Sequence, residues 1–101
     1  MPNVALFIER NWHATTPQGD GVTVRFGVGL PVRKPTGEWS AFVSLDGLES
    51  TTTIFGEDGW QAVVLGMSFI ASRVSDYEAR GWRFCWSDGG EPVTAQDLRR
   101  G

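Results

Sequence analysis

One long stretch of the chain, residues 57–80, carries hydrophobic residues with the period of an α-helix. The positions recur at steps of three and four, which places them on one stripe of a helix: Trp60, Val63, Val64, Met67, Ile70, Val74 and Tyr77. Ala62, Leu65 and Phe69 widen this stripe, and residues 59–72 carry no charge. We therefore expect a helix that lies across a sheet and is buried over much of its circumference.

The flanks of this stretch match the ends of a helix. Glu57 and Asp58 place negative charge at the start, where the helix dipole is positive, and Arg80 followed by Gly81 suits the end. The uncharged positions would reach only about 21 Å, which is too short to cross the core of a bilayer. We expect no membrane partner.

Alternating patterns predict strands before and after the helix. Residues 22–28 give the clearest one, with valine or phenylalanine at every second position. Residues 4–12, 38–45 and 51–55 also favour strands, as does a short stretch in which Trp82, Phe84 and Trp86 share one side. Turn residues separate them: a hairpin loop at 15–21, an exposed connection at 31–37, and turns at 46–47 and 88–90.

This order predicts an α+β fold in one domain, residues 1–101. We expect an antiparallel sheet of about five strands, in the order β-β-β-β-α-β, with one long helix packed on one face and the other face open. Thr94 and Asp97 resemble a weak capping box, so residues 91–101 are expected to form a short helical turn or a frayed tail.

The net charge and the composition argue against several classes of function. A net charge of −3 argues against a general binder of nucleic acids or anionic membranes, which needs a concentrated positive field. A hydrophobic content of 41% suits a folded core, and the single cysteine excludes an internal disulfide. That cysteine and the lack of a secretory pattern in the first ten residues predict a cytoplasmic protein.

Candidate chemistry is sparse. His13 is the only histidine, and the sequence places no nucleophile or orienting group beside it. Cys85 lies in an aromatic strand and is expected to pack as a small hydrophobic residue, and its distance from His13 in sequence gives no zinc spacing. We expect no catalytic residue, no metal and no cofactor, and hence not an enzyme.

Aromatic and arginine side chains suggest a contact surface. If Val24 and Val43 face the helix, then Arg25, Phe42 and, less directly, Phe7, Glu9 and Arg83 point to the open face of the sheet. Such residues are enriched in protein interfaces. An ordinary amphipathic sheet face is the alternative. Trp82, Phe84 and Trp86 are expected to fill the core, with a stacking platform for bases or sugars as the other reading.

The sequence contains two further candidate contact surfaces. Acidic residues near strand ends form a candidate patch that would attract a basic partner: Asp46, Glu49, Glu57 and Asp58. Solvated turns and helix caps are the plainer reading. Leu65 and Phe69 widen the helical stripe and fit either the seam of a homodimer or the rim of the core.

Short patterns along the chain resemble a small bacterial domain family of unknown function. They are Trp12-His13, Thr16-Pro17, Ile54-Phe55-Gly56, Asp58, Gln61-Ala62, Leu65 and Phe69-Ile70. The resemblance implies a compact α+β domain and transfers no catalytic residue. In size and character the chain is also similar to bacterial and phage inhibitors of the immunity and anti-defence type.

The sequence therefore predicts a small module that binds another protein and blocks it sterically. The first alternative is a ligand-binding domain or small enzyme with a cleft near His13. The second is a binder of single-stranded nucleic acid that uses an aromatic sheet.

Overall fold

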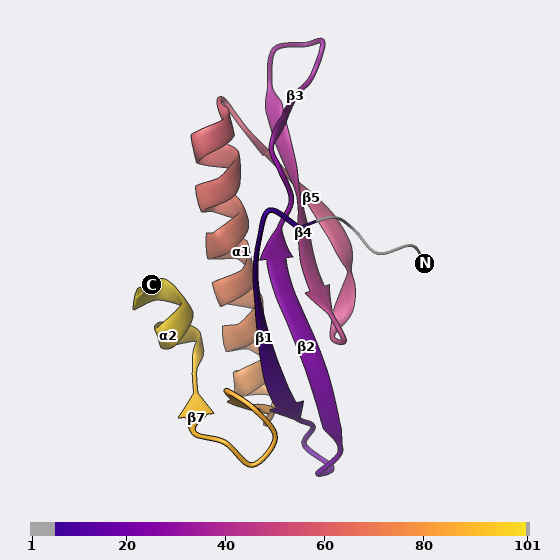
Figure 1. The fold of residues 1–101 in the computed structure, drawn as a ribbon, viewed down its shortest axis with the longest axis vertical. Coiled ribbons are helices and arrows are strands. Elements are labelled where there is room, and N and C mark those ends of the chain that lie inside the picture. Colours follow the sequence, from indigo (N-terminus) through magenta and orange to yellow (C-terminus); the bar gives the residue numbers. More distant parts are fainter. Residues whose placement is uncertain (1–5, 101) are drawn as a thin grey trace.

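The long apolar stretch forms helix α1, Gly59–Ala79, which covers one face of a seven-stranded sheet in the computed structural model (Figure 1). The structure describes residues 6–100. The other elements are β1 Ile8–Thr15, β2 Gly21–Val28, β3 Val32–Arg33, β4 Trp39–Asp46, β5 Glu49–Gly56, β6 Arg83–Cys85, β7 Pro92–Val93 and α2 Ala95–Arg100. The predicted α+β class, with one long helix on one face of an antiparallel sheet, is confirmed.

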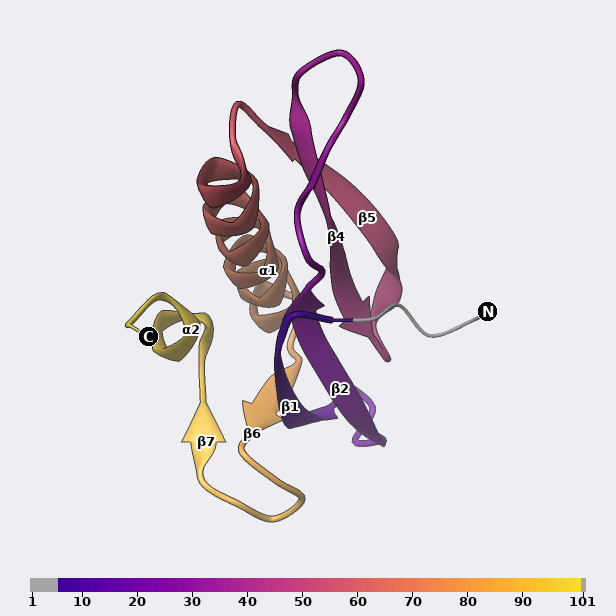
Figure 2. The ribbon, with the colours of Figure 1, turned by 45° about the horizontal axis from the view of Figure 1, so that its top comes forward.

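Every strand pairing is antiparallel. β1 pairs with β2, β2 with β4 and β4 with β5, while β6 returns after the helix to pair with the last residues of β1. Val43 of β4 pairs with both Val28 and Thr52, so β2 and β5 lie on opposite edges of β4. β3 continues along the edge that β2 occupies, and Figure 2 shows the β3–β4 turn projecting past the start of α1.

The sheet has seven strands and not the predicted five, because two additional strands of two residues each extend it. β3 lies inside the predicted connection at 31–37, and β7 follows the turn at 88–90. The predicted first strand, residues 4–12, is also displaced: β1 begins at Ile8 and ends at Thr15, and residues 4 and 5 lie outside the described residues. β1 continues beyond the predicted end at residue 12 because Ala14 is fully buried and its neighbours pair with β6.

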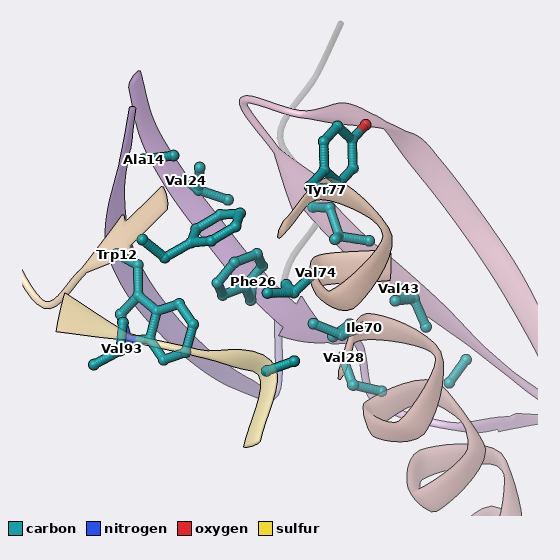
Figure 3. Packing of buried hydrophobic residues seen from close by; sticks show 14 of the residues in the cluster. Trp12, Ala14, Val24, Phe26, Val28, Val43, Ile70, Val74, Tyr77 and Val93 are labelled. Carbon is teal, nitrogen blue, oxygen red and sulfur yellow. The ribbon is translucent and has the colours of Figure 1, made fainter. Parts of the chain in front are cut away.

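Alternating strand positions meet the helix in a core of large apolar side chains. Phe26 and Val28 from the sheet point toward Val74 and Ile70 of α1, as Figure 3 shows, and each of them is nearly or fully buried. Trp12 belongs to the same core and lies beside Val93. Trp12 and Phe26 meet edge to face, with ring centroids 5.3 Å apart and an interplanar angle of 85°. The sequence pattern of β2 therefore places its valine and phenylalanine side chains against the helix.

Gly66 sets how closely α1 approaches the sheet. A Cβ atom at this position would lie 3.0 Å from Val43 Cγ2 and 3.4 Å from Val28 Cγ1. A larger residue would push the helix away from β2 and β4, because packed interiors have little room for additional methyl groups.

The expected extent of helix burial is wrong on one side of α1. Trp60 is 82% exposed, and Val64 and Met67 are also exposed, although all three belong to the predicted apolar stripe. The buried helix residues are Ala62, Gly66, Ile70, Ala71, Val74 and Tyr77. A single sheet covers only one arc of a helix, and α2 packs against α1 without covering the first turns, as Figure 1 shows.

Both ends of α1 carry the expected stop and start signals. The Asp58 carboxylate accepts a hydrogen bond from the Gln61 N–H at 2.7 Å, and the Gln61 side chain accepts one from the Glu57 N–H at 2.7 Å. These reciprocal bonds satisfy donors that a helix start leaves free. At the other end, Arg80 is the C-cap and Gly81 has φ of +96°, a conformation that glycine adopts without strain.

Of the three aromatic residues placed in the core by sequence, Phe84 alone is fully buried. Trp82 is half-buried and packs edge to face on Tyr77 at 5.2 Å. Trp86, which follows the end of β6, is 49% exposed. Its ring meets Trp12 edge to face at 6.1 Å, and the Arg10 guanidinium lies 5.1 Å from the ring centre. After β7, the Thr94 N–H donates to the Asp97 carboxylate at 2.8 Å at the start of α2.

Candidate functional site

The face of the sheet opposite α1 is the candidate binding surface, called here the outer face. Residues paired across antiparallel strands point to the same side, so the registers identify residues of this face. Among them are Glu9, Asn11, His13, Thr23, Arg25, Ser40, Phe42, Asp46, Thr53, Phe55, Arg83 and Cys85. Four of the five predicted contact residues, Glu9, Arg25, Phe42 and Arg83, lie on this face. Phe7 precedes β1, is 65% exposed, and donates its N–H to the Val28 carbonyl at 2.9 Å.

One half of the outer face is aromatic. Phe42 on β4 is 54% exposed and Phe55 on β5 is 49% exposed. Phe42 pairs with Thr53, two residues from Phe55, so the two rings are diagonal neighbours. The Lys34 ammonium lies 5.8 Å from the centre of the Phe55 ring. Sequence reasoning missed Phe55, although its alternation with Thr51 and Thr53 is a usable signal.

The other half is charged. Arg25 on β2 forms an ion pair with Glu9 on β1, and the register places Asp46 of β4 directly beside Arg25. Arg83 is exposed on β6, opposite Thr15. Because the Glu9 and Arg25 side chains remain 42% and 32% exposed, their ion pair adds little to stability and stays accessible to a partner.

The Leu6 side chain covers part of the outer face between its aromatic half and its charged half. A Cβ atom on Gly27 would lie 2.5 Å from Leu6 Cδ1, so the Leu6 side chain rests on the outer face at Gly27. Gly27 and Ser44, which pair across β2 and β4, are both buried there. The outer face is thus less open at its centre than the sequence predicts.

The fold gathers His13, Cys85 and Asp88 at one end of the outer face. His13 pairs with Cys85 across β1 and β6, and its Nε2 lies 3.6 Å from Asp88 Oδ1. The His13 ring also lies over Gly21, where a Cβ would be 3.0 Å from Nε2. No local pattern in the sequence predicts this arrangement, because the three residues come from segments on either side of the helix.

The predicted acidic patch is not formed. Asp46 and Glu49 flank the β4–β5 turn, whereas Glu57 and Asp58 follow the opposite end of β5. An eight-residue strand separates these pairs by roughly 25 Å. Asp58 caps α1, and Glu49 binds Arg73 on the helix side of the sheet. The Asp58 and Glu49 carboxylates therefore have structural roles.

Two hollows lie away from His13. A cavity of about 150 Å³ lies between the start of β1, α1 and α2, with Phe26, Val28, Met67, Ile70 and Leu98 in its lining. A shallow depression next to Phe55 is lined by Glu38, Glu57 and Gln61. Within residues 6–100, no three histidine, cysteine or acidic side chains are placed to hold a metal ion.

In the described part of the chain, no helix has the length and apolar character needed to span a membrane. The resemblance to a small bacterial domain family remains a prediction. Comparison with protein-family models, with curated proteins and with solved structures finds no match for this chain.

Proposed function

We propose that this protein is a small protein-binding module of the immunity or anti-defence type, which inhibits its partner by steric occlusion. The outer face is the contact surface. The observation that carries this proposal is the pair of exposed rings, Phe42 and Phe55, on the same face as the exposed Arg83 and the half-buried Arg25. Aromatic and arginine side chains are enriched in protein interfaces, and neighbouring exposed apolar side chains are typical of binding sites.

In this mechanism each half of the outer face has its own role. Phe42 and Phe55 supply apolar area that a partner desolvates, with Phe7 at the margin. Arg25 and Arg83 supply charge that sets orientation and speeds the encounter, and Glu9 keeps the Arg25 guanidinium in position. No group on this face needs to react, since coverage of the partner's own site is sufficient for inhibition.

The test is affinity capture with matched variants from lysate of the native cell or host. Phe42→Ala and Arg83→Glu remove one residue from each half of the face. Trp60→Ala and Arg33→Glu are the controls, because Trp60 is 82% exposed on α1 and Arg33, exposed on β3, shares the helix side with Trp39. We expect one protein to be captured by the wild type and both controls and to be lost with both face variants, all of them with native circular dichroism.

Inhibition is then measured on that captured protein, using its own activity. Equal capture by the wild type and the two face variants would remove the outer face from the proposal. Capture without any effect on the partner's activity would remove steric inhibition and leave binding alone.

A second candidate function, ligand binding or catalysis near His13, is favoured by the gathering of His13, Cys85 and Asp88. A ligand that binds there would raise the melting temperature of the folded protein. We expect a small-molecule panel to give no stabilisation that depends on His13; a shift that disappears in His13→Ala would favour this candidate instead.

Binding of single-stranded nucleic acid is a further alternative. Phe84 is buried on the helix side, and Trp82 packs on Tyr77, so an aromatic platform would have to use Phe42 and Phe55. Retention on a single-stranded DNA or RNA column that weakens steeply with salt would support it.

A further inference from the structure

Strand β5 forms one border of the sheet. β4 pairs with β5 along one of its edges and with β2 and β3 along the other, and no described strand lies beyond β5. Figure 2 shows β5 at the side of the sheet, with no other described helix or strand along its outer edge. A free edge offers a row of backbone donors and acceptors to a further strand.

The register identifies which backbone groups are free. The Gly29 N–H donates to the Phe42 carbonyl at 2.8 Å, so the backbone groups of Phe42 point away from β5. In an antiparallel ladder, directly opposed residues either bond to each other or both point away. Thr53, the partner of Phe42, therefore turns its N–H and C=O to the free edge, and Phe55 does the same two residues later.

The sequence of β5 lacks the residues that commonly prevent an exposed edge from pairing with another strand. Residues 50–56 contain no charged residue and no proline, which are the groups that proteins commonly place on exposed edges. Glu49, the one carboxylate of the strand, is directed to Arg73 of α1. The edge is therefore able to accept another strand without bringing like charges together.

The same edge is complementary to itself. If two copies pair antiparallel about Thr53, each Thr53 lies opposite its own copy, and Phe55 lies opposite Thr51 of the second copy. Thr53 and Phe55 turn their backbone groups to the edge, so the hydrogen bonds between the two Thr53 residues form in register, and the register of β5 against β4 shifts only beyond Thr52. Pairs of aromatic and β-branched side chains are favourable across strands.

A row of residues on α1, apolar at Leu65 and Phe69, borders this edge. Leu65, Phe69 and Arg73 are spaced by four residues and share one side of the helix. Arg73 contacts Glu49 of β5, so the whole row lies on the β5 side. Leu65 is 43% exposed and Phe69 and Ile54 are half-buried, which leaves apolar area beside the strand on the helix side of the sheet.

We propose that the protein forms a homodimer in which β5 pairs antiparallel with β5 of a second copy. A two-fold axis at Thr53, normal to the sheet, joins the two sheets into one and brings the two Leu65 rows together on the helix side. Both outer faces then lie on the same side, with the Phe42 and Phe55 side chains of the two copies adjacent. The dimer does not depend on the proposed inhibitory function.

The first test is the mass in solution, measured by light scattering on the wild type and four single variants. We expect the wild type to have twice the mass of the 11.1 kDa chain. Thr53→Lys adds a charge at the two-fold axis and Leu65→Glu adds one to the helix row, and both should be monomeric. The controls Thr23→Lys, at an exposed position in β2, and Val64→Glu, at 48% exposure beside Leu65, should remain dimeric.

The second test is crosslinking, which reports the register. Opposed residues in a hydrogen-bonded antiparallel pair have Cα atoms about 5.5 Å apart, within the range that a disulfide spans. In a Cys85→Ser background, oxidation should join two copies through Thr53→Cys. Thr51→Cys should remain uncrosslinked, because each Thr51 lies opposite Phe55 of the other copy.

A folded wild type that is monomeric at about 100 µM would overturn the dimer. A dimer that survives both Thr53→Lys and Leu65→Glu, or that crosslinks through Thr51→Cys in place of Thr53→Cys, would overturn the β5 arrangement. The dimer and the proposed function can be tested independently. If the wild type is monomeric but captures a partner that Arg83→Glu does not capture, the dimer is excluded and the proposed function still stands.

Discussion

Arg73 of α1 holds Glu49 of β5 through two nitrogen atoms. Nη2 donates to Oε1 at 2.9 Å, and Nε lies 3.1 Å from the same oxygen. The Tyr77 hydroxyl donates to this oxygen as well, at 2.9 Å. The hydrogen bond from Arg73 lowers the pKa of Glu49 more than burial raises it, and burial with the Glu49 contact raises the pKa of Tyr77. The helix is thereby fixed to the border strand by charge as well as by packing.

The Glu49 contact should make stability depend on pH. A lowered pKa in the folded state contributes stability that is complete above the ordinary carboxyl value, about 4.3, and is lost as the pH falls through the lowered pKa. Glu49→Gln should lower the free energy of unfolding by about 1–2 kcal/mol at pH 7. The difference from wild type should shrink below about pH 4, as measured by urea unfolding at several pH values.

The control is Glu91→Gln, since Glu91 is exposed in the loop before β7. It should change stability by less than about 0.5 kcal/mol. If Glu49→Gln has the same effect at pH 3 as at pH 7, the ion pair is not the source of the stabilisation.

Removal of the Asp58 cap should weaken α1. Asp58→Ala leaves the Gln61 N–H without its 2.7 Å acceptor and should cost about 1 kcal/mol, which corresponds to roughly 4–8 °C in melting temperature. Asp58→Ser keeps an acceptor at the cap and should retain most of the wild-type melting temperature in calorimetry. Equal losses in the two variants would argue against a capping role.

Gly66 and Val43 should show energetic coupling. Gly66→Val places methyl groups where a Cβ already lies 3.0 Å from Val43 Cγ2, and should destabilise by about 1–3 kcal/mol. Val43→Ala opens space at the same point, so the double variant should be more stable than the sum of the single changes predicts, by at least about 0.5 kcal/mol. Chemical unfolding of the four proteins in this cycle measures the coupling, and strict additivity would contradict the close approach.

Trp12 should tolerate phenylalanine but not alanine. Its side chain is 1% exposed, and Nε1 is buried with no hydrogen-bond partner among the described residues. Trp12→Phe keeps an aromatic ring against Phe26 and removes the unsatisfied donor, so stability should stay within about 1 kcal/mol of wild type. Trp12→Ala should cost about 3–5 kcal/mol. Thermal unfolding followed by circular dichroism separates the two, and a similar loss in both would assign an energetic role to the indole N–H.

The sequence by itself determined those features that depend on neighbouring residues. Val24, Phe26 and Val28 alternate, and their burial follows from the period of a strand. The helix from Gly59 to Ala79 follows from its apolar period and from the cap at Asp58, because both signals act within one or two turns.

Only the tertiary structure decided which surfaces are covered. The pairing of His13 with Cys85 joins segments 72 residues apart, and the free edge of β5 depends on where β2, β3 and β4 lie. Trp60 and Val64 have the same periodicity as the buried Ile70, yet they are exposed because no element among residues 6–100 covers the first turns of α1 on that side. Local pattern fixes the form of an element, whereas its exposed area depends on contacts between residues far apart in the chain.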